Sequence, residues 1–282
     1  MSQNTLNIEN ETDIQLLMPA IPQGLDHQQT IDYVLTHFWD DLNVNDTSQT
    51  HDSAFIEQNF ANYSLFLANA GDSIVRQESV AKLMSRLEVD SVAYKLMANT
   101  AFHYLYDPNS PLLSEEAYIP FLVVLSESTY LGEAERTRNK YLLQNALKNR
   151  PGMTAADFKY ENRNGEKVSL LSTPVSGNLL LMFYDPDCEH CKEIINLMIE
   201  SKDLKQMIKK GELTLLAIYT GEDKDLWMHT SPTLPQEWIV GYDSGIIDDQ
   251  ELYVFMATPT FYLLDSDKKI IFKDLPIENL LH

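Results

Sequence analysis

The single Cys-x-x-Cys pair restricts the fold of this chain more than any other feature, because it stands between two strongly patterned runs. Cys188 and Cys191 are the only cysteines. The apolar run 179–184 predicts a buried strand, and residues 188–210 predict a helix. A cysteine at the start of a helix is stabilised as a thiolate by unpaired N–H groups and by the helix dipole. The second cysteine, one turn later, can close a disulfide with the first.

The pair has two chemical interpretations, a redox dithiol and half of a zinc site. A structural zinc ion needs two further ligands, and the chain has no other cysteine and seven scattered histidines. The order strand, cysteine pair, helix therefore favours redox chemistry, which requires no metal and no organic cofactor. In this interpretation Cys188 is the nucleophile and Cys191 is the resolving thiol.

The two residues between the cysteines are candidates for tuning their chemistry. An imidazolium at His190 would lower the pKa of Cys188 and make the disulfide more oxidising. The carboxylate of Glu189 would oppose this effect by repelling the thiolate. The alternative for both is an exposed, solvated side chain that does not influence the sulfur.

Charge and hydropathy exclude several classes of partner. The 282 residues carry 42 acidic and 21 basic side chains, a net charge of −21, so we expect no nucleic-acid partner and no electrostatic docking on anionic lipid. No apolar run is long enough to cross a bilayer. Residues 1–11 lack the basic start and apolar core of a secretion signal. With no cysteine outside the pair, composition leaves the compartment open.

The hydrophobic period changes near the middle of the chain. Residues 28–150 repeat apolar side chains at helical spacing, which predicts an all-α region of five or six helices. The turn residues 149–152, Asn-Arg-Pro-Gly, end this region. Length also favours two domains, and we predict a polar leader at 1–26, a helical domain at 27–150 and a second domain at 151–282.

The second domain has the pattern of an α/β layer fold. Apolar runs predict strands at 168–170, 179–184, 213–219, 238–240, 260–264 and 270–273. Helical patterns occur at 188–210, 223–229 and 248–255. The predicted fold class is thus an all-α N-terminal domain followed by an α/β domain.

Beyond the cysteine pair, the second domain contains Ala156-Asp157-Phe158, Val168-Ser169-Leu170 and Thr258-Pro259-Thr260. With these segments, residues 151–282 resemble the thioredoxin-like superfamily, specifically the TlpA and ResA type of periplasmic thiol-disulfide oxidoreductase. The resemblance implies a central mixed sheet flanked by helices and a redox-active dithiol. It also implies that Thr258 and Pro259 lie beside the dithiol and hold the backbone of the substrate.

The whole chain is similar to a group of secreted or lipid-anchored thioredoxin-like proteins of Gram-negative anaerobes, which carry a helical N-terminal domain of unknown function. The segments that carry this similarity are 104–111, 118–120, 149–152 and 184–188. It implies a periplasmic or cell-envelope location, with membrane attachment only through a possible lipid anchor whose signal has been removed. The implied partners are protein thiols and disulfides and an upstream redox protein.

Three positions depart from the family pattern. The buried acid that thioredoxin has six residues before its first cysteine is Met182 here, and the tryptophan just before that cysteine is Asp187. The glutamate that some ResA-like reductases place after the second cysteine is Ile194. The predicted function is thiol-disulfide exchange with exported proteins. The rival interpretation is an interaction protein, whose helical domain binds a partner and whose dithiol is a redox switch or a relic.

Overall fold

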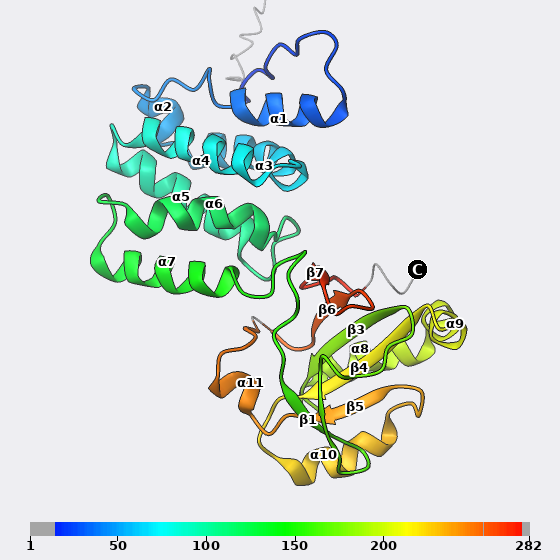
Figure 1. The fold of residues 1–282 in the computed structure, drawn as a ribbon. Coiled ribbons are helices and arrows are strands. Elements are labelled where there is room, and N and C mark those ends of the chain that lie inside the picture. Colours follow the sequence, from blue (N-terminus) through cyan, green and yellow to red (C-terminus); the bar gives the residue numbers. More distant parts are fainter. Residues whose placement is uncertain (1–14, 256, 278–282) are drawn as a thin grey trace, which may run out of the picture. The chain divides into compact units, whose positions relative to one another are not determined.

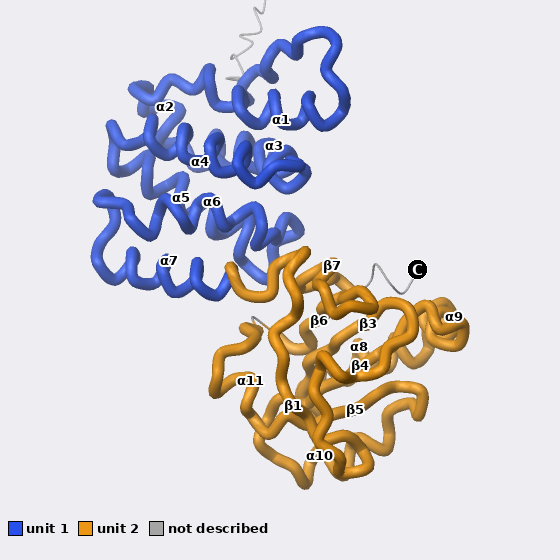
Figure 2. The backbone as a smooth tube through the Cα atoms, viewed as in Figure 1, with its two compact units in different colours: residues 1–146 blue, residues 147–282 orange. Residues whose placement is uncertain are grey.

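The structure is a computed structural model that describes residues 15–255 and 257–277. Most of the predicted leader, residues 1–14, lies outside this description. The chain divides into two compact units, residues 1–146 and 147–282 (Figure 2). The domain limits expected from the sequence, 27–150 and 151–282, stay a prediction. None of the described helices has both the length and the apolar content needed to cross a membrane.

The described residues of the first unit form helices and no strands (Figure 1). The helices are α1 (His27–His37), α2 (Thr47–Thr50), α3 (Ser53–Asn69), α4 (Ser73–Leu87), α5 (Ser91–Leu105), α6 (Glu115–Glu127) and α7 (Glu133–Ala146). The helical first half predicted from periodicity is confirmed, and the single turn α2 is an addition. The first five helices share one start signal, an aspartate whose carboxylate accepts backbone N–H groups of the first turn.

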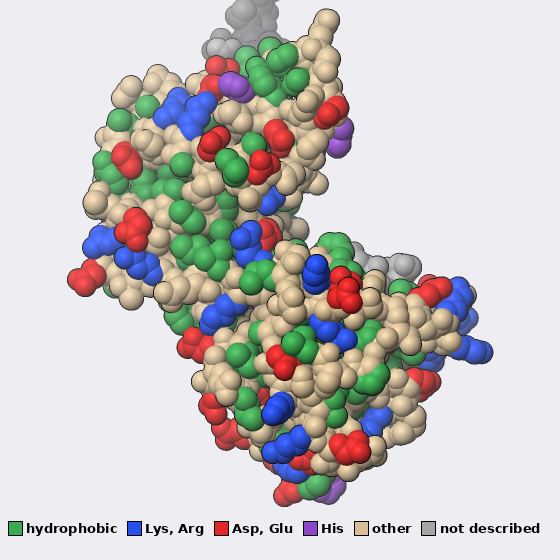
Figure 3. All heavy atoms as spheres, in the orientation of Figure 1, with side chains coloured by type: hydrophobic (Ala, Val, Ile, Leu, Met, Phe, Trp, Pro, Cys, Tyr) green, Lys and Arg blue, Asp and Glu red, His purple; other side chains and the backbone are tan. Residues whose placement is uncertain are grey.

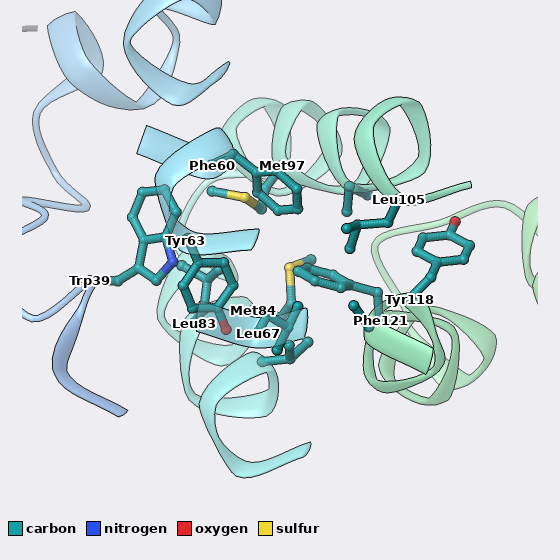
Figure 4. Close-up of a cluster of buried hydrophobic side chains, with 14 of the residues drawn as sticks. Trp39, Phe60, Tyr63, Leu67, Leu83, Met84, Met97, Leu105, Tyr118 and Phe121 are labelled. Atoms are coloured by element: carbon teal, nitrogen blue, oxygen red, sulfur yellow. The ribbon is translucent and has the colours of Figure 1, made fainter. Parts of the chain in front are cut away.

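Large apolar side chains from these helices fill the core of the first unit. Figure 4 shows the interior cluster formed by Trp39, Phe60, Tyr63, Leu67, Leu83, Met84, Met97, Leu105, Tyr118 and Phe121. The buried Tyr63 hydroxyl lies 2.8 Å from Ser79 Oγ, which donates to the Leu35 carbonyl at 2.7 Å. These bonds satisfy the buried polar groups and join α1, α3 and α4.

The second unit is a seven-stranded mixed sheet with the order β2-β1-β5-β4-β3-β6-β7. Its strands are β1 (Lys159–Asn162), β2 (Lys167–Ser169), β3 (Asn178–Tyr184), β4 (Leu213–Tyr219), β5 (Ile239–Tyr242), β6 (Thr260–Leu264) and β7 (Ile270–Lys273). The neighbours β3, β4 and β5 are parallel, whereas β6 runs antiparallel to β3. The predicted α/β layer fold is confirmed.

Alternate residues of β3 face two different cores, so the strand is buried on both sides. Leu180, Met182 and Tyr184 pack with α8 (Glu189–Glu200), α9 (Lys202–Lys210) and α10 (Lys224–Thr230). Leu181 and Phe183 pack on the opposite face with α11 (Ile246–Asp249) and the segment after it. The continuous apolar run before the cysteines is therefore the central strand of the sheet.

Two predicted helices differ from the observed ones, and one observed strand was not predicted. The helix expected at 188–210 is broken at Ser201, whose backbone is extended and whose Oγ caps α9 by accepting the N–H of Leu204. The helix expected at 248–255 ends at Asp249, because Glu251 adopts a left-handed φ of 48°. Strand β1 was not predicted, since it is four residues long and pairs with β5 far along the chain.

Candidate active site

Cys188 lies where β3 passes into α8, and it is the N-cap residue of that helix. Its Sγ accepts the backbone N–H of Cys191 at 3.4 Å. Both cysteines are free thiols; Cys188 is partly exposed, and Cys191 is fully buried. The structure therefore brings the two sulfurs together and gives them unequal access to solvent.

A tight turn before Cys188 sets the position of that residue. The Asp185 carboxylate accepts the N–H of Asp187 at 2.8 Å, and the Asp185 carbonyl accepts the N–H of Cys188 at 3.2 Å. Pro186, between them, is buried. This turn was not predicted from the sequence, although an Asp-Pro pair directly after a strand is a recognisable turn signal.

The surroundings of Cys188 lower the pKa of its thiol below the ordinary value. The largest cause is the backbone N–H of Cys191, which donates to the sulfur. Burial acts in the opposite direction, while the Cys191 thiol, the Thr258 side chain and the backbone N–H of His190 add further stabilisation. At neutral pH a larger fraction of this thiol is thus ionised than in a free cysteine.

Burial has the opposite effect on Cys191. It raises the pKa of the Cys191 thiol to about 11, although the backbone of Asp185 and the Thr258 side chain partly oppose this rise. Because the negative charge on Cys188 also disfavours a second thiolate, the two thiols ionise in sequence.

Thr258 and Pro259 lie next to the dithiol, as the family resemblance implies. The peptide bond between them is cis. The Cys188 thiol donates to the Thr258 carbonyl at 3.7 Å, so residues 70 positions apart in sequence meet at the sulfur. Their role in binding substrate stays a prediction.

The side chains of Glu189 and His190 point to solvent and pair with their own helix. Glu189 Oε1 lies 2.6 Å from Lys192 Nζ, and His190 Nδ1 lies 3.8 Å from Glu193 Oε2. In this arrangement the backbone N–H of His190 helps to lower the pKa of the Cys188 thiol. A tuning role for either side chain stays a prediction.

Within residues 15–255 and 257–277, no three His, Cys, Asp or Glu side chains come together in a way that could hold a metal ion.

Comparison with known proteins gives two independent matches. Residues 1–149 match the family described as "Domain of unknown function (DUF5106)". The chain is also similar to the crystal structure of a thioredoxin-like protein from Bacteroides caccae, with 35% sequence identity and a TM-score of 0.82. The match covers 93% of this chain and 95% of the Bacteroides caccae protein. This chain is a thioredoxin-like protein of the DUF5106 family.

Other solved structures match parts of the chain. A conserved protein of unknown function from Bacteroides fragilis is 39% identical over 46% of this chain and 96% of its own, with a TM-score of 0.44. A domain of a possible thiol-disulfide isomerase from Cytophaga hutchinsonii is 25% identical over 48% of this chain and 90% of its own, with a TM-score of 0.41. No curated protein matches the chain.

This DUF5106 protein lacks an acid at both family positions beneath the dithiol. Met182 and Ile194 are buried in the apolar core between the sheet and α8. Near Cys191 the structure instead places Tyr184, whose hydroxyl is buried without a hydrogen-bond partner among the described residues. Burial raises the pKa of Tyr184, and the charge of Arg163 partly offsets this. Tyr184 was not predicted as a site residue, because in the sequence the last residue of a buried strand cannot be distinguished from any other core position.

The unequal pKa values of the two thiols predict unequal alkylation of this DUF5106 protein. Iodoacetamide should modify Cys188 with a midpoint below the ordinary thiol pKa of about 8.5, because its folded-state pKa is lowered. Cys191 should stay unmodified until the pH approaches about 11. Mass spectrometry of the labelled peptides measures both profiles. Protein unfolded in urea is the control, and identical profiles in the folded and unfolded protein would contradict the described geometry.

Proposed function

We propose that this protein is a thiol-disulfide oxidoreductase that exchanges disulfides with exported proteins. The observation that carries the proposal is the asymmetry of the dithiol. Cys188 is accessible and has a lowered pKa at the start of α8, whereas Cys191 is buried and has a raised one. Enzymes of this class need one sulfur to meet the substrate and a second that reacts only from within.

In the proposed reaction the Cys188 thiolate attacks one sulfur of a substrate disulfide, and the other substrate sulfur leaves as a thiolate. A mixed disulfide results. The Cys191 thiol then gives its proton to a departing thiolate and attacks Cys188 Sγ, which releases the second substrate sulfur. The substrate gains two electrons, and the Cys188–Cys191 pair becomes a disulfide. The reverse sequence oxidises a substrate dithiol, and the potential of the couple relative to its partner sets the direction.

The backbone around Thr258 and Pro259 fits the role of a substrate clamp. The Thr258 carbonyl is close enough to accept from the Cys188 thiol, so a peptide bound there has its sulfur near Cys188. An upstream redox protein restores the dithiol after each turnover. The similarity to secreted and lipid-anchored proteins supports a periplasmic or cell-envelope location, where disulfides persist.

An exchange assay tests the proposal. The purified full chain, kept reduced with dithiothreitol, should accelerate the reduction of insulin disulfides, or it should speed the refolding of a scrambled disulfide protein. Titration against glutathione gives the potential and hence the direction. If neither reaction is accelerated and both thiols titrate at the ordinary value, the rival function, an interaction protein with an inert dithiol, replaces this one.

A further inference from the structure

A groove runs along α8, the helix that Cys188 caps. Its first part has a volume of about 380 Å³ and starts at Pro186, two residues before Cys188. One wall is a single face of α8, formed by Lys192, Ile195, Asn196 and Ile199. The other wall is formed by Thr230, Thr233 and Leu234, and Tyr184 also lines this part.

A second hollow of about 350 Å³ continues from the first, and Ile199 lines both. Its walls are Met198 and Ile199 of α8, Leu204, Lys205, Ile208 and Lys209 of α9, and Pro235, Glu237 and Trp238 of the facing segment. Leu234 of the first part and Pro235 of the second are consecutive residues. The two hollows thus form one groove between α8–α9 and the segment 230–238.

Arg163 holds the segment 230–238 in place. Its guanidinium donates five hydrogen bonds, of 2.9 to 3.2 Å, to the carbonyl oxygens of Ser231, Leu234, Pro235 and Trp238. Fixing these carbonyls removes most of the freedom that a nine-residue connection would otherwise have. The groove is therefore formed before any partner arrives, which reduces the entropy cost of binding.

The floor of the groove is apolar, and its rim carries three lysines, Lys192, Lys205 and Lys209, against one carboxylate, Glu237. The buried side chains of both walls, which include Ile195, Leu234 and Trp238, make up this floor. Lys205 and Lys209 stand on the rim, and neither has a described carboxylate within ion-pair distance. Helix α9 carries four lysines in nine residues, and Figure 3 shows basic side chains gathered over this helix. This contrasts with the net charge of −21 of the whole chain.

We propose that this groove binds an extended segment of the substrate protein that carries apolar and acidic side chains, adjacent to the sulfur that reacts with Cys188. The α8 face from Lys192 to Ile199 is about 10 Å long at the helical rise per residue, which matches about three residues of extended chain. Apolar side chains fill the floor, and carboxylates meet Lys205 and Lys209. This inference rests on the proposed function and names its class of substrate.

Binding of cysteine-free peptides tests the groove separately from the exchange reaction. Fluorescein-labelled octapeptides of alternating Leu and Glu, Leu and Lys, or Ser and Glu are titrated with the reduced full chain, and anisotropy is measured. The Leu–Glu peptide should bind about tenfold more tightly than either other peptide, because only it matches both floor and rim. High salt should weaken its binding, since the lysines are exposed.

Paired variants locate the binding site. Ile199→Glu, in the wall that both hollows share, should weaken Leu–Glu binding about tenfold, whereas Leu197→Glu, an exposed position on the same helix outside the groove, should not. Lys209→Glu should weaken binding of the Leu–Glu peptide and strengthen that of the Leu–Lys peptide. Lys202→Glu, on the same helix but away from the lining, is its control. Circular dichroism establishes that each variant is folded.

Three outcomes would overturn the inference. They are equal binding of all peptides, equal effects of Ile199→Glu and Leu197→Glu, or a dimer of the chain that Ile199→Glu dissociates, which would make a second copy the occupant. If the Leu–Glu peptide binds as expected but its disulfide-bearing counterpart is not exchanged, the groove stands and the proposed oxidoreductase function fails.

Discussion

Replacing Cys188 by serine should reduce the turnover of insulin disulfides to the uncatalysed rate. The hydroxyl of serine is not ionised at neutral pH, so the variant cannot form the mixed disulfide. The change should leave the fold intact, because serine is a good N-cap residue and can accept the Cys191 N–H in place of the sulfur. The measurement is the rate of insulin precipitation, with circular dichroism as the check on folding.

Replacing Cys191 by serine should have a different effect, the accumulation of covalent adducts. Cys188 can still attack a substrate, but no second sulfur resolves the intermediate. Non-reducing electrophoresis should reveal adducts that disappear with dithiothreitol and that the Cys188→Ser/Cys191→Ser double variant does not form. Adducts through Cys191 in the Cys188→Ser variant would make Cys191 the nucleophile instead of Cys188. Such adducts are not expected, since Cys191 is completely buried.

The second large effect is expected at Gly177, which leads into β3. Its φ is +67°, and a Cβ there would lie 2.1 Å from the backbone oxygen of Glu212. That oxygen also accepts the N–H of Asn178 at 3.0 Å, so relief of the clash has to separate the starts of β3 and β4. Gly177→Ala should therefore cost at least about 3 kcal/mol, from left-handed strain plus the clash of backbone atoms.

A matched control separates the two contributions at Gly177. Gly152 also has a left-handed backbone, with φ +86°, but no atom lies within 4 Å of the position of its Cβ. Gly152→Ala should cost about 1 kcal/mol from strain alone. Urea unfolding of each variant is followed by fluorescence in a Trp39→Phe background, so that Trp227 and Trp238 report on the second unit. Equal losses at the two glycines would contradict the close approach of Gly177 to Glu212.

The sequence predicts best those elements whose pattern is local. The strands at 213–219, 260–264 and 270–273 are found with those bounds, because each is an apolar run between turn residues. The helices of the first unit follow from the spacing of apolar residues. The break at Ser201 was missed, since a serine inside an amphipathic pattern does not reveal whether it caps a new helix.

The candidate site was only partly predictable for the same reason. Cys188 and Cys191 are separated by two residues, so their proximity follows from the sequence. The contact of Thr258 with Cys188 followed from family resemblance, not from local pattern. The groove depends on hydrogen bonds from Arg163 to carbonyls about 70 residues away. Every residue has a backbone carbonyl, so the residue types do not indicate which carbonyls accept hydrogen bonds from Arg163. The groove could therefore not be predicted from the sequence.

The position of Cys188 as cap of α8 links its redox chemistry to folding. Closing a disulfide removes the negative charge from Sγ, while the N–H groups of Cys191 and His190 still point at the helix start. The free energy that these dipoles give to the thiolate is thus absent from the oxidised protein. This stabilisation of the thiolate favours the reduced form of the protein, so it raises the reduction potential of the Cys188–Cys191 couple. In a thermodynamic cycle, the same free energy also makes the reduced form more resistant to unfolding. Substitutions that reorient the first turn of α8 should therefore shift the potential while both cysteines stay in place.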